Sequence, residues 1–467
     1  MRKVCLLIFI LFSTQSRTAH SQNFEWVKSL GSFNDDILFN SPAELAVDKK
    51  GNCYVPFTGI INQDSIFFDG QFIESLRDST RGGLLKVDNS GRPIKLLQGD
   101  IKQPILENDT SLWIVARSPF DLYDDSLELN DTTIFLERDS INYLINLDTA
   151  FNYIKHFSYS SGQYTITDSF IFSTNLLEIN KYDKKKGVFL EKTSYNGNSV
   201  KVLFPRKINV DIKNKRIIAI GTVQQIANNL DFVFNGNTYS GNQFIVTYDF
   251  DFSVLKVKTL SLQSKLNVNL SSSTSIEGLE LTNSNNIFLT GSISIPNNLS
   301  RKSGFIALLN NQQNLNWVIK NDPLTTSFTT FYNSSIDQSN NFLYILGSYT
   351  GMSSLDGFEL PKVVRPRNIP VGLRVSNRLI AKLDTLGNVI WVYGAAPSSD
   401  AVTSSDLAID SSSNAYFAGV FQNTFITSID TATSTGGFDI FLAKVSDLSL
   451  RRDTNLADAY CAGDSIM

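Results

Sequence analysis

The stretch ELAVDKKGNCYVPF, residues 44–57, decides the fold. It reads as an apolar strand, a polar turn opened by Asp48 and a second apolar strand, a pattern typical of short β-strands joined by tight turns. Similar stretches recur along the chain, and such recurrence indicates a repeat architecture. The others are ILENDTSLWIVAR from Ile105, YTITDSFIFST from Tyr164, INVDIKNKRIIAIG from Ile208, GLELTNSNNIFLTG from Gly278, SSIDQSNNFLYILG from Ser334 and DLAIDSSSNAYFAG from Asp406.

Two further features recur in register with this hairpin. Aligning the second strands of the hairpins places one apolar residue of each in a single column: Tyr54, Trp113, Phe170, Ile218, Phe288, Tyr344 and Tyr416. A third strand follows each hairpin and closes on a small polar residue: Asp88, Asp148, Asp183, Asp249, Asn310, Asp384 and Ser446. The aspartates are predicted to open turns, because their carboxylates can accept backbone N–H groups just ahead. A fourth strand then leaves the turn, marked by Trp317 and Trp391 in units five and six.

The repeat predicts an all-β, seven-bladed β-propeller with four strands in each blade. A four-stranded sheet cannot bury both of its faces alone, so the units must pack face to face, and radial packing leaves few exposed edges. The alternative is two β-sandwiches of seven strands each. That arrangement predicts no column shared along the whole chain, so the propeller is favoured.

The first stretch after residue 22, FEWVKSLG at residues 24–31, has the sequence of a fourth strand, with Trp26 aligned to Trp317 and Trp391. Unit seven lacks a fourth strand of its own, because after Ser446 it continues only as DLSLRRD, without a tryptophan-bearing strand. We therefore predict that residues 24–30 complete the last blade, beside Leu442–Ser446, and close the ring.

The two ends of the chain are expected to lie outside the propeller, which we place at residues 23–452. Residues 1–22 have a basic head, the apolar run VCLLIFILF and a small-x-small pattern before Ser21-Gln22. This is the pattern of a cleaved secretory signal peptide, too short to cross a ~30 Å hydrocarbon layer as a helix. We expect an extracellular or cell-surface protein without a transmembrane segment. Residues 453–467 are expected to be a tail or the start of a further module.

The hairpin residues Asp48, Gly51, Asn52 and Tyr54, their relatives in unit seven and the stretch GGFDIFLAKVS at 436–446 resemble bacterial β-propeller repeats of the SBBP type. Such repeats occur in exported and cell-surface proteins, so the resemblance implies a propeller and an extracellular scaffold role. It implies no catalytic residues, because the recurring positions are turn and core positions. The stretch CAGDSI in the tail resembles the opening strand of immunoglobulin-like or PKD-like modules of exported Bacteroidetes proteins, which would make the chain a truncated piece of a larger one.

Composition excludes several partners and chemistries. Removal of the leader takes away three of the 41 basic side chains and none of the 45 acidic ones, so the remaining chain is acidic. An acidic surface is a poor partner for nucleic acid. Of the two cysteines outside the leader, we expect Cys53 to be a buried thiol and Cys461 a tail thiol. The mature chain has a single histidine, His156, which we expect on a surface strand. No catalytic motif, zinc-binding cluster or cofactor motif is present, so we expect neither an enzyme nor a bound cofactor.

Two groups of residues are candidates for binding. The acidic stretch DLYDDSLELND holds Asp121, Asp124 and Asp125; a solvated loop is the preferred interpretation, and a calcium site is the alternative. The long segment from Gly351 to Asn377 carries Arg365, Arg367 and Arg374.

We expect a monomeric, non-enzymatic propeller that binds a protein or glycan at one ring face, with these arginines in a ligand-face loop. The alternative is a carboxylate-dependent glycan hydrolase or lyase with its site at the mouth of the central channel.

Overall fold

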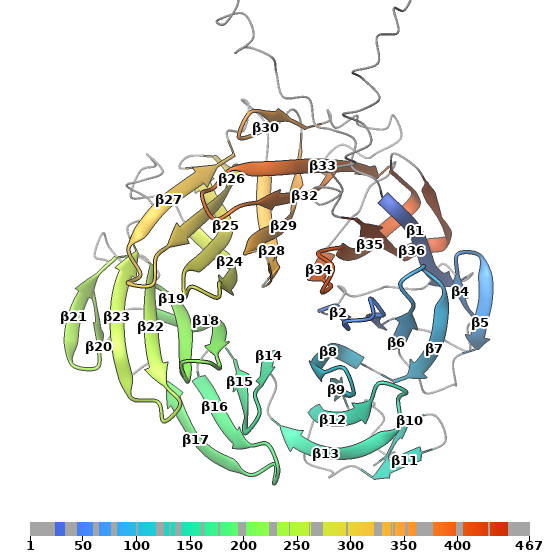
Figure 1. Ribbon diagram of the computed structural model, residues 1–467, viewed down its shortest axis with the longest axis horizontal. Coiled ribbons are helices and arrows are strands. Elements are labelled where there is room, and N and C mark those ends of the chain that lie inside the picture. Colours follow the sequence, from blue (N-terminus) through green and yellow to red (C-terminus); the bar gives the residue numbers. More distant parts are fainter. Residues whose placement is uncertain are drawn as a thin grey trace, which may run out of the picture.

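A computed structural model of the full chain shows a seven-bladed β-propeller (Figure 1). The structure describes residues 24–32, 44–58, 65–75, 82–99, 101–117, 126–129, 132–135, 142–159, 163–175, 178–194, 202–223, 231–241, 243–260, 262, 274–295, 298–321, 329–337, 339, 341–350, 354–360, 377–397, 405–427 and 430–446. Within these ranges every regular element is a β-strand. A helix long and apolar enough to span a membrane does not occur among them.

Each blade is a four-stranded antiparallel sheet, numbered here from its innermost strand outward. Blade one is β2 (Ala46–Val47), β3 (Cys53–Thr58), β6 (Gly82–Val87) and β7 (Pro93–Gln98); blade two is β8 (Ile101–Asn108), β9 (Ser111–Arg117), β12 (Asn142–Asp148) and β13 (Tyr153–Tyr159). Blade three is β14 (Gln163–Ile166), β15 (Phe170–Thr174), β16 (Glu178–Asp183) and β17 (Phe189–Ser194); blade four is β18 (Val202–Asp211), β19 (Arg216–Val223), β22 (Gln243–Asp249) and β23 (Val254–Leu260).

The remaining blades follow the same order, and the last one takes its outer strand from the start of the chain. Blade five is β24 (Thr274–Leu281), β25 (Ile287–Ile295), β26 (Asn298–Leu309) and β27 (Leu315–Lys320); blade six is β28 (Thr329–Asp337), β29 (Phe342–Tyr349), β32 (Asn377–Leu383) and β33 (Val389–Pro397). Blade seven is β34 (Ser405–Ile409), β35 (Ala415–Ile426), β36 (Thr431–Val445) and β1 (Phe24–Ser32). The predicted units and the closing strand are therefore confirmed. The column of second-strand residues is confirmed in six blades, whereas in blade three the equivalent position, opposite Lys181, is held by Phe172 and not by Phe170.

The ring is closed by backbone hydrogen bonds between β1 and β36. The two strands run antiparallel, with Trp26 opposite Lys444 and Leu30 opposite Ile440, so the pairing covers Ile440–Val445 and starts slightly earlier than predicted. Phe24 and Leu30 are each 1% exposed, because they pack into the clusters that join blade seven to its neighbours on either side. Figure 1 shows β1, drawn in blue, beside β36, drawn in red.

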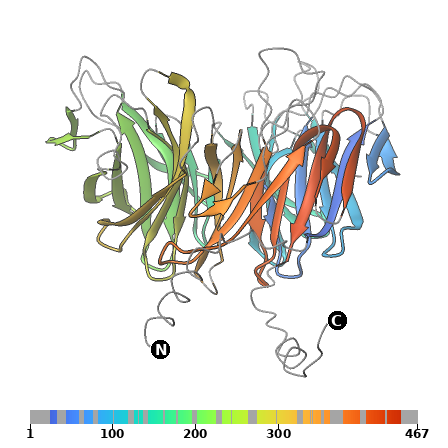
Figure 2. The same ribbon diagram turned by 90° about the horizontal axis from the view of Figure 1, so that it is seen from above.

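The two faces of the disc differ in the kind of connection that they carry. Because the strands alternate in direction, the tight turns after the first strands of all blades and after the third strands of blades one to six lie on one face, which we call the turn face. The connections after the second strands lie on the opposite face, which we call the insertion face (Figure 2). Four of these connections contain extra hairpins: β4 (Ser65–Phe68) with β5 (Gln71–Ser75), β10 (Ser126–Leu129) with β11 (Thr132–Phe135), β20 (Asp231–Phe234) with β21 (Asn237–Ser240), and β30 (Ser354–Leu355) with β31 (Phe358–Glu359).

Turns on the turn face have the predicted aspartate chemistry. In blade one the Asp88 carboxylate accepts hydrogen bonds from the backbone N–H groups of Ser90 (2.8 Å) and Arg92 (2.9 Å). Gly91 has a φ of +83°, a left-handed conformation that favours glycine, and a Cβ there would lie 2.9 Å from the Trp26 ring. The aspartate therefore fixes the turn, while glycine lets the tryptophan of the closing strand pack directly against it.

Each turn also accepts hydrogen bonds or an ion pair from the preceding blade. Lysine and tryptophan side chains on the third and fourth strands supply the donors. The pairs are Lys95 Nζ with Ala150 O (2.7 Å), Lys155 Nζ with Lys184 O (3.0 Å), Lys181 Nζ with Asp251 Oδ1 (3.0 Å), Lys256 Nζ with Gln312 O (2.7 Å), Trp317 Nε1 with Thr385 O (3.1 Å) and Trp26 Nε1 with Asn89 O (3.0 Å). The last pair shows that Trp26 of the closing strand makes the same contact with the next blade as Trp317 does.

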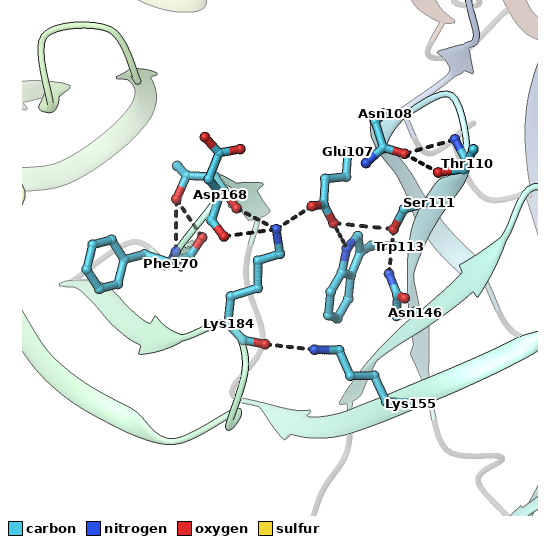
Figure 3. A network of polar contacts seen from close by, with 11 residues as sticks. Glu107, Asn108, Thr110, Ser111, Trp113, Asn146, Lys155, Asp168, Phe170 and Lys184 are labelled. Atoms are coloured by element: carbon cyan, nitrogen blue, oxygen red, sulfur yellow. Dashed lines mark hydrogen bonds and ion pairs between the residues drawn. The ribbon is translucent and has the colours of Figure 1, made fainter.

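Blades two and three are joined by an additional buried network (Figure 3). Glu107 forms an ion pair with Lys184, and their side chains are only 19% and 14% exposed. Trp113 Nε1 donates to the other oxygen of Glu107 at 2.8 Å, and Lys184 Nζ also donates to the carbonyl oxygens of Thr167 (2.9 Å) and Asp168 (3.2 Å). Burial alone would raise the pKa of Glu107, but the hydrogen bonds from Lys184 and Trp113 and the lysine charge hold it below its ordinary value.

Deleting residues 23–31 is expected to unfold the ring rather than merely loosen it. The deletion removes the buried side chains of Phe24, Trp26, Val27 and Leu30. Their burial contributes roughly 6–12 kcal/mol in total, which is comparable to the whole stability of a typical domain. Thermal unfolding followed by circular dichroism tests this, and a deletion variant that melts at the temperature of the full chain would contradict the closure of the ring by β1.

The partly buried ion pair gives a second prediction, for which blade three supplies a matched control. Lys184→Met leaves Glu107 with the Trp113 hydrogen bond but without its charged partner, and is expected to cost about 1–3 kcal/mol at neutral pH. Lys192→Met removes an ion pair with Glu178 whose side chains are 56% and 24% exposed, and should cost about 0–1 kcal/mol.

The cost of Lys184→Met should depend on pH. Because the pKa of Glu107 is lowered by folding, its stabilising effect is present above the unfolded-state pKa and is lost as pH falls through the folded-state pKa. Urea unfolding at pH 7 and pH 3.5 measures both variants. Equal losses in the two variants, or a Lys184→Met loss that stays the same at both pH values, would contradict this role.

Candidate functional site: the central channel

The channel on the ring axis is surrounded by the innermost strands of all blades: β2, β8, β14, β18, β24, β28 and β34 (Figure 1). It contains a cavity of about 240 Å³. Polar side chains from every blade line this cavity: Glu44, Gln103, Gln163, Lys207, Asn209, Glu277, Glu280, Asn333, Ser334 and Asp406. Gln103, Gln163 and Asp406 lie at the starts of their strands, which places the cavity towards the insertion face.

Two of the carboxylates connect blades across the channel. Asp406 is 5% exposed and accepts hydrogen bonds from the backbone N–H of Leu45 in blade one and from the Asn333 amide in blade six. Glu44 accepts a hydrogen bond from the Gln103 amide on one oxygen and from the Gln163 amide, at 3.3 Å, on the other. These two carboxylates therefore link blade seven to blades one and six, and blade one to blades two and three.

The enclosed position of the channel carboxylates raises their pKa values. Burial raises the pKa of Glu280 to about 8, and the charge of Lys207 offsets this only in part. Burial together with the charge of Glu44 raises the pKa of Asp406 to about 8. Burial also raises the pKa of Glu44. At neutral pH the cavity therefore holds protons that the same groups would release in water.

Several of the polar residues that line the cavity occupy the same position in the sequence repeat. Glu44, Gln163, Lys207, Asn333 and Asp406 each stand four residues before the polar residue that opens the first turn of their blade. In blades two and five a β-bulge shifts the strand, so that Gln103 and Glu277 face the channel instead of their neighbours. The column could have been found from the repeat alignment, but the bulges could not.

The residues predicted from the sequence to bind a ligand all lie outside the described residues. They are Asp121, Asp124 and Asp125 of the acidic stretch, and Arg365, Arg367 and Arg374 of the long segment. Metal-binding clusters of three or more His, Cys, Asp or Glu do not occur in the described part of the chain.

His156 lies on the outer strand β13 as predicted, where its Nδ1 is 2.9 Å from the hydroxyl of Tyr153. Cys53 is buried as predicted, and Cys461 falls outside the described ranges.

Comparisons with known proteins find similarity in structure only. Neither a protein-family model nor a curated protein matches the chain. Among solved structures, the chain is similar to the WD40 repeats of RRP9, at 7% identity and a TM-score of 0.45 over 89% of this chain and 97% of that one. It is also similar to Hsv2 of Kluyvelomyces marxianus, at 7% identity and a TM-score of 0.40 over 82% of this chain and 93% of that one.

A polysaccharide lyase, the PL25 ulvan lyase, is similar at 9% identity with a TM-score of 0.41, over 78% of this chain and 95% of that one. Identities this low bear on the fold alone.

The raised pKa of Glu280 predicts how stability depends on pH. Between about 4.5 and 8 the unfolded chain releases a proton that the folded chain retains, so this residue lowers stability progressively as pH rises and its full penalty is present above 8. Glu280→Gln removes the titration. We expect the variant to match the wild type at pH 4.5 and to melt at least about 2 °C higher at pH 9. Differential scanning calorimetry measures this, and a difference that does not grow with pH would contradict the enclosed position of Glu280.

Proposed function

We propose that this chain is an exported β-propeller that acts as a non-enzymatic binding module, with a protein or glycan partner at the insertion face. The propeller fold supports a binding or scaffold role in general. The observation that carries the proposal is a sheet that continues through three blades on that face. It joins β33 of blade six to β35 of blade seven and β1 of blade seven to the hairpin β4–β5 of blade one.

The continuous sheet is built by backbone pairing between insertions and neighbouring blades. Ala396 and Pro397 of β33 pair with Ile426 and Phe425 at the end of β35. At the other junction Leu30 of β1 pairs with Phe68 of β4. Phe425 stacks on Phe441 with ring centroids 3.9 Å apart and planes inclined by 6°, which anchors the extended hairpin on blade seven.

The hairpin β4–β5 and the ends of β1, β33 and β35 form a supported platform. A surface held by backbone hydrogen bonds across several blades loses little conformational freedom on binding, which favours affinity. The described residues that flank the arginine-bearing segment, Leu360 and Asn377, are anchored on blade six: Leu360 packs in its core, and Asn377 Nδ2 donates to Tyr349 OH at 3.1 Å. Arg365, Arg367 and Arg374 lie in sequence between them.

Export and surface location rest on the sequence. The basic head and short apolar run of residues 1–22 support a cleaved leader, and the resemblance to SBBP-type repeats supports a bacterial cell-surface or secreted setting. Both belong to the proposal.

The enzymatic alternative rests on the carboxylates of the channel. Glu44, Glu280 and Asp406 do gather there, and the raised pKa of Glu280 would suit a general acid. However, both oxygens of Glu44 and both oxygens of Asp406 already accept hydrogen bonds from other blades. A hydrolase needs two carboxylates that face a substrate. Because two of the four channel carboxylates already link blades, the arrangement supports a structural use of the channel over this chemistry.

An array of bacterial and host polysaccharides and extracellular proteins tests the proposed function with a matched pair of variants. The variant Arg365→Gln/Arg367→Gln/Arg374→Gln alters the proposed ligand-face segment. The control Lys185→Gln/Lys186→Gln/Lys213→Gln makes the same charge change at exposed positions on the turn face. We expect the arginine variant to lose about tenfold or more in affinity for whatever the wild type binds, because charged groups steer and fix such partners. The control should bind as the wild type does.

Two outcomes would contradict the proposed function. One is a wild-type chain that binds nothing on the array, or a turn-face control that loses as much affinity as the arginine variant. The other is the release of new sugar ends from an array polysaccharide by the wild type but not by Glu280→Gln, which would make the channel an active site.

A further inference from the structure

The cavity in the channel presents an excess of hydrogen-bond acceptors. The side-chain nitrogens of Gln103 and Gln163 donate to Glu44, that of Asn333 donates to Asp406, and that of Asn209 donates to the carbonyl of Leu279 at 3.1 Å. Each of these amide groups therefore has one of its two N–H donors engaged by the protein itself. Within the described structure no donor reaches the side-chain oxygens of Gln103, Gln163 and Asn209.

One buried hydroxyl in the cavity wall has no hydrogen bond of normal length and angle. Ser334 is 5% exposed and lines the cavity; its Oγ lies near the Glu280 carboxyl and lowers the pKa of that group slightly, but it has no well-formed hydrogen bond within the described part of the chain. A buried polar atom without a partner is unfavourable by about 1–3 kcal/mol, so such atoms often mark a place that a ligand or water fills. Gly278 forms the adjacent wall, where a Cβ would lie 2.4 Å from that oxygen, so glycine leaves the hydroxyl accessible.

The charges in the cavity favour a cation. Four carboxylates, of Glu44, Glu277, Glu280 and Asp406, line it against the single ammonium group of Lys207. Lys207 forms no ion pair with any described residue, and its charge reaches Glu44, Glu280 and Asp406 only at longer range. Once the carboxylates are ionised, the cavity carries a net negative charge inside a ring that screens it weakly from water.

We propose that the channel cavity binds a small organic cation, an aliphatic ammonium compound with several N–H donors. The acceptors converge from different blades, as multiple donors on one small molecule require. A cavity of about 240 Å³ limits the ligand to a compact molecule. This site lies on the ring axis and is separate from the arginine-bearing segment, so it does not depend on the function proposed for the insertion face.

Inorganic ions and neutral polyols fit the cavity less well. The described residues contain no group of three metal-ligating side chains close enough for one ion. A polyol carries no charge, so it would leave the ionised carboxylates of the cavity without a counter-charge, whereas an organic cation supplies one.

Binding should strengthen as pH rises. Glu280 faces Glu44 from blade one, Lys207 from blade four, Glu277 from its own strand and Asp406 from blade seven. With a pKa of about 8 it is protonated at pH 6.5 and largely ionised at pH 8.5. A cation must displace that proton, which predicts a gain in affinity of about tenfold between these pH values.

Isothermal titration calorimetry with 1,4-diaminobutane tests the proposal on the full chain. We expect Glu280→Gln to weaken binding at pH 8.5 by about tenfold or more, because it removes a charge that faces the ligand. Lys207→Met should strengthen binding by about threefold or more, because it removes a competing cation. Asp168→Asn, the same type of change at an exposed position of the turn face, should leave the affinity unchanged.

The gain expected for Lys207→Met keeps the test independent of folding, since a damaged channel does not bind more tightly. Three results would overturn the proposal: no heat of binding at pH 8.5 with millimolar diamine, equal affinities in Glu280→Gln and Asp168→Asn, or equal binding of neutral 1,4-butanediol. Calcium chloride that binds in place of the diamine, with dependence on Glu280, would overturn it in favour of a metal site.

Discussion

The turn that follows the third strand of each blade is the contact on which the ring depends. In blade six the Asp384 carboxylate holds the backbone N–H groups of Leu386 (2.9 Å) and Asn388 (2.8 Å), which leaves the carbonyl of Thr385 pointing outward to accept the indole N–H of Trp317. One short turn motif thus connects two strands of its own blade and accepts a hydrogen bond from the neighbouring blade. Because the same device recurs at six of the seven junctions, stacking there needs no special interface, and stability is distributed along the repeat.

The junction between blades six and seven shows what happens without this turn. Blade seven has no chain link between its third and fourth strands, because β36 ends at Val445 and β1 begins at Phe24. Trp391, the equivalent of Trp317, is 3% exposed, and its indole N–H has no acceptor among the described residues. The junction relies instead on a different contact, in which Tyr344 OH donates to Ser413 O at 2.9 Å. Ring closure by β1 thus restores the backbone sheet of blade seven without restoring the turn.

Much of this architecture could be predicted from the sequence, because it follows from local chemistry that repeats. Asp88 and Asp384 predict the turns that they open, and Trp26 identifies the closing strand because its position matches that of Trp317. The pairing of the insertions with neighbouring blades could not be predicted, since it depends on backbone contacts between segments such as β1 and β4 that share no sequence signal. The Glu107–Lys184 pair was likewise hidden, because the two residues are far apart in sequence and meet only when blades two and three pack.

The channel was the part of the molecule least visible in the sequence. Glu44 and Asp406 share a position four residues before the first turn of their blades, but only ring closure brings them to one axis with Glu280. Their raised pKa values are likewise a consequence of that enclosure rather than of any local motif. The ring thus creates a polar interior whose chemistry is independent of the insertion face.

Hydrogen–deuterium exchange resolved by peptide mass spectrometry tests the central claim that the start of the chain is the last strand of the ring. If β1 pairs with β36 along Trp26–Leu30 and Ile440–Lys444, the amides of both strands should exchange at similarly slow rates, opening only with the ring. Rapid exchange throughout residues 24–32, with β36 still protected, would show that β1 is not part of the fold and would contradict the closed seven-bladed ring.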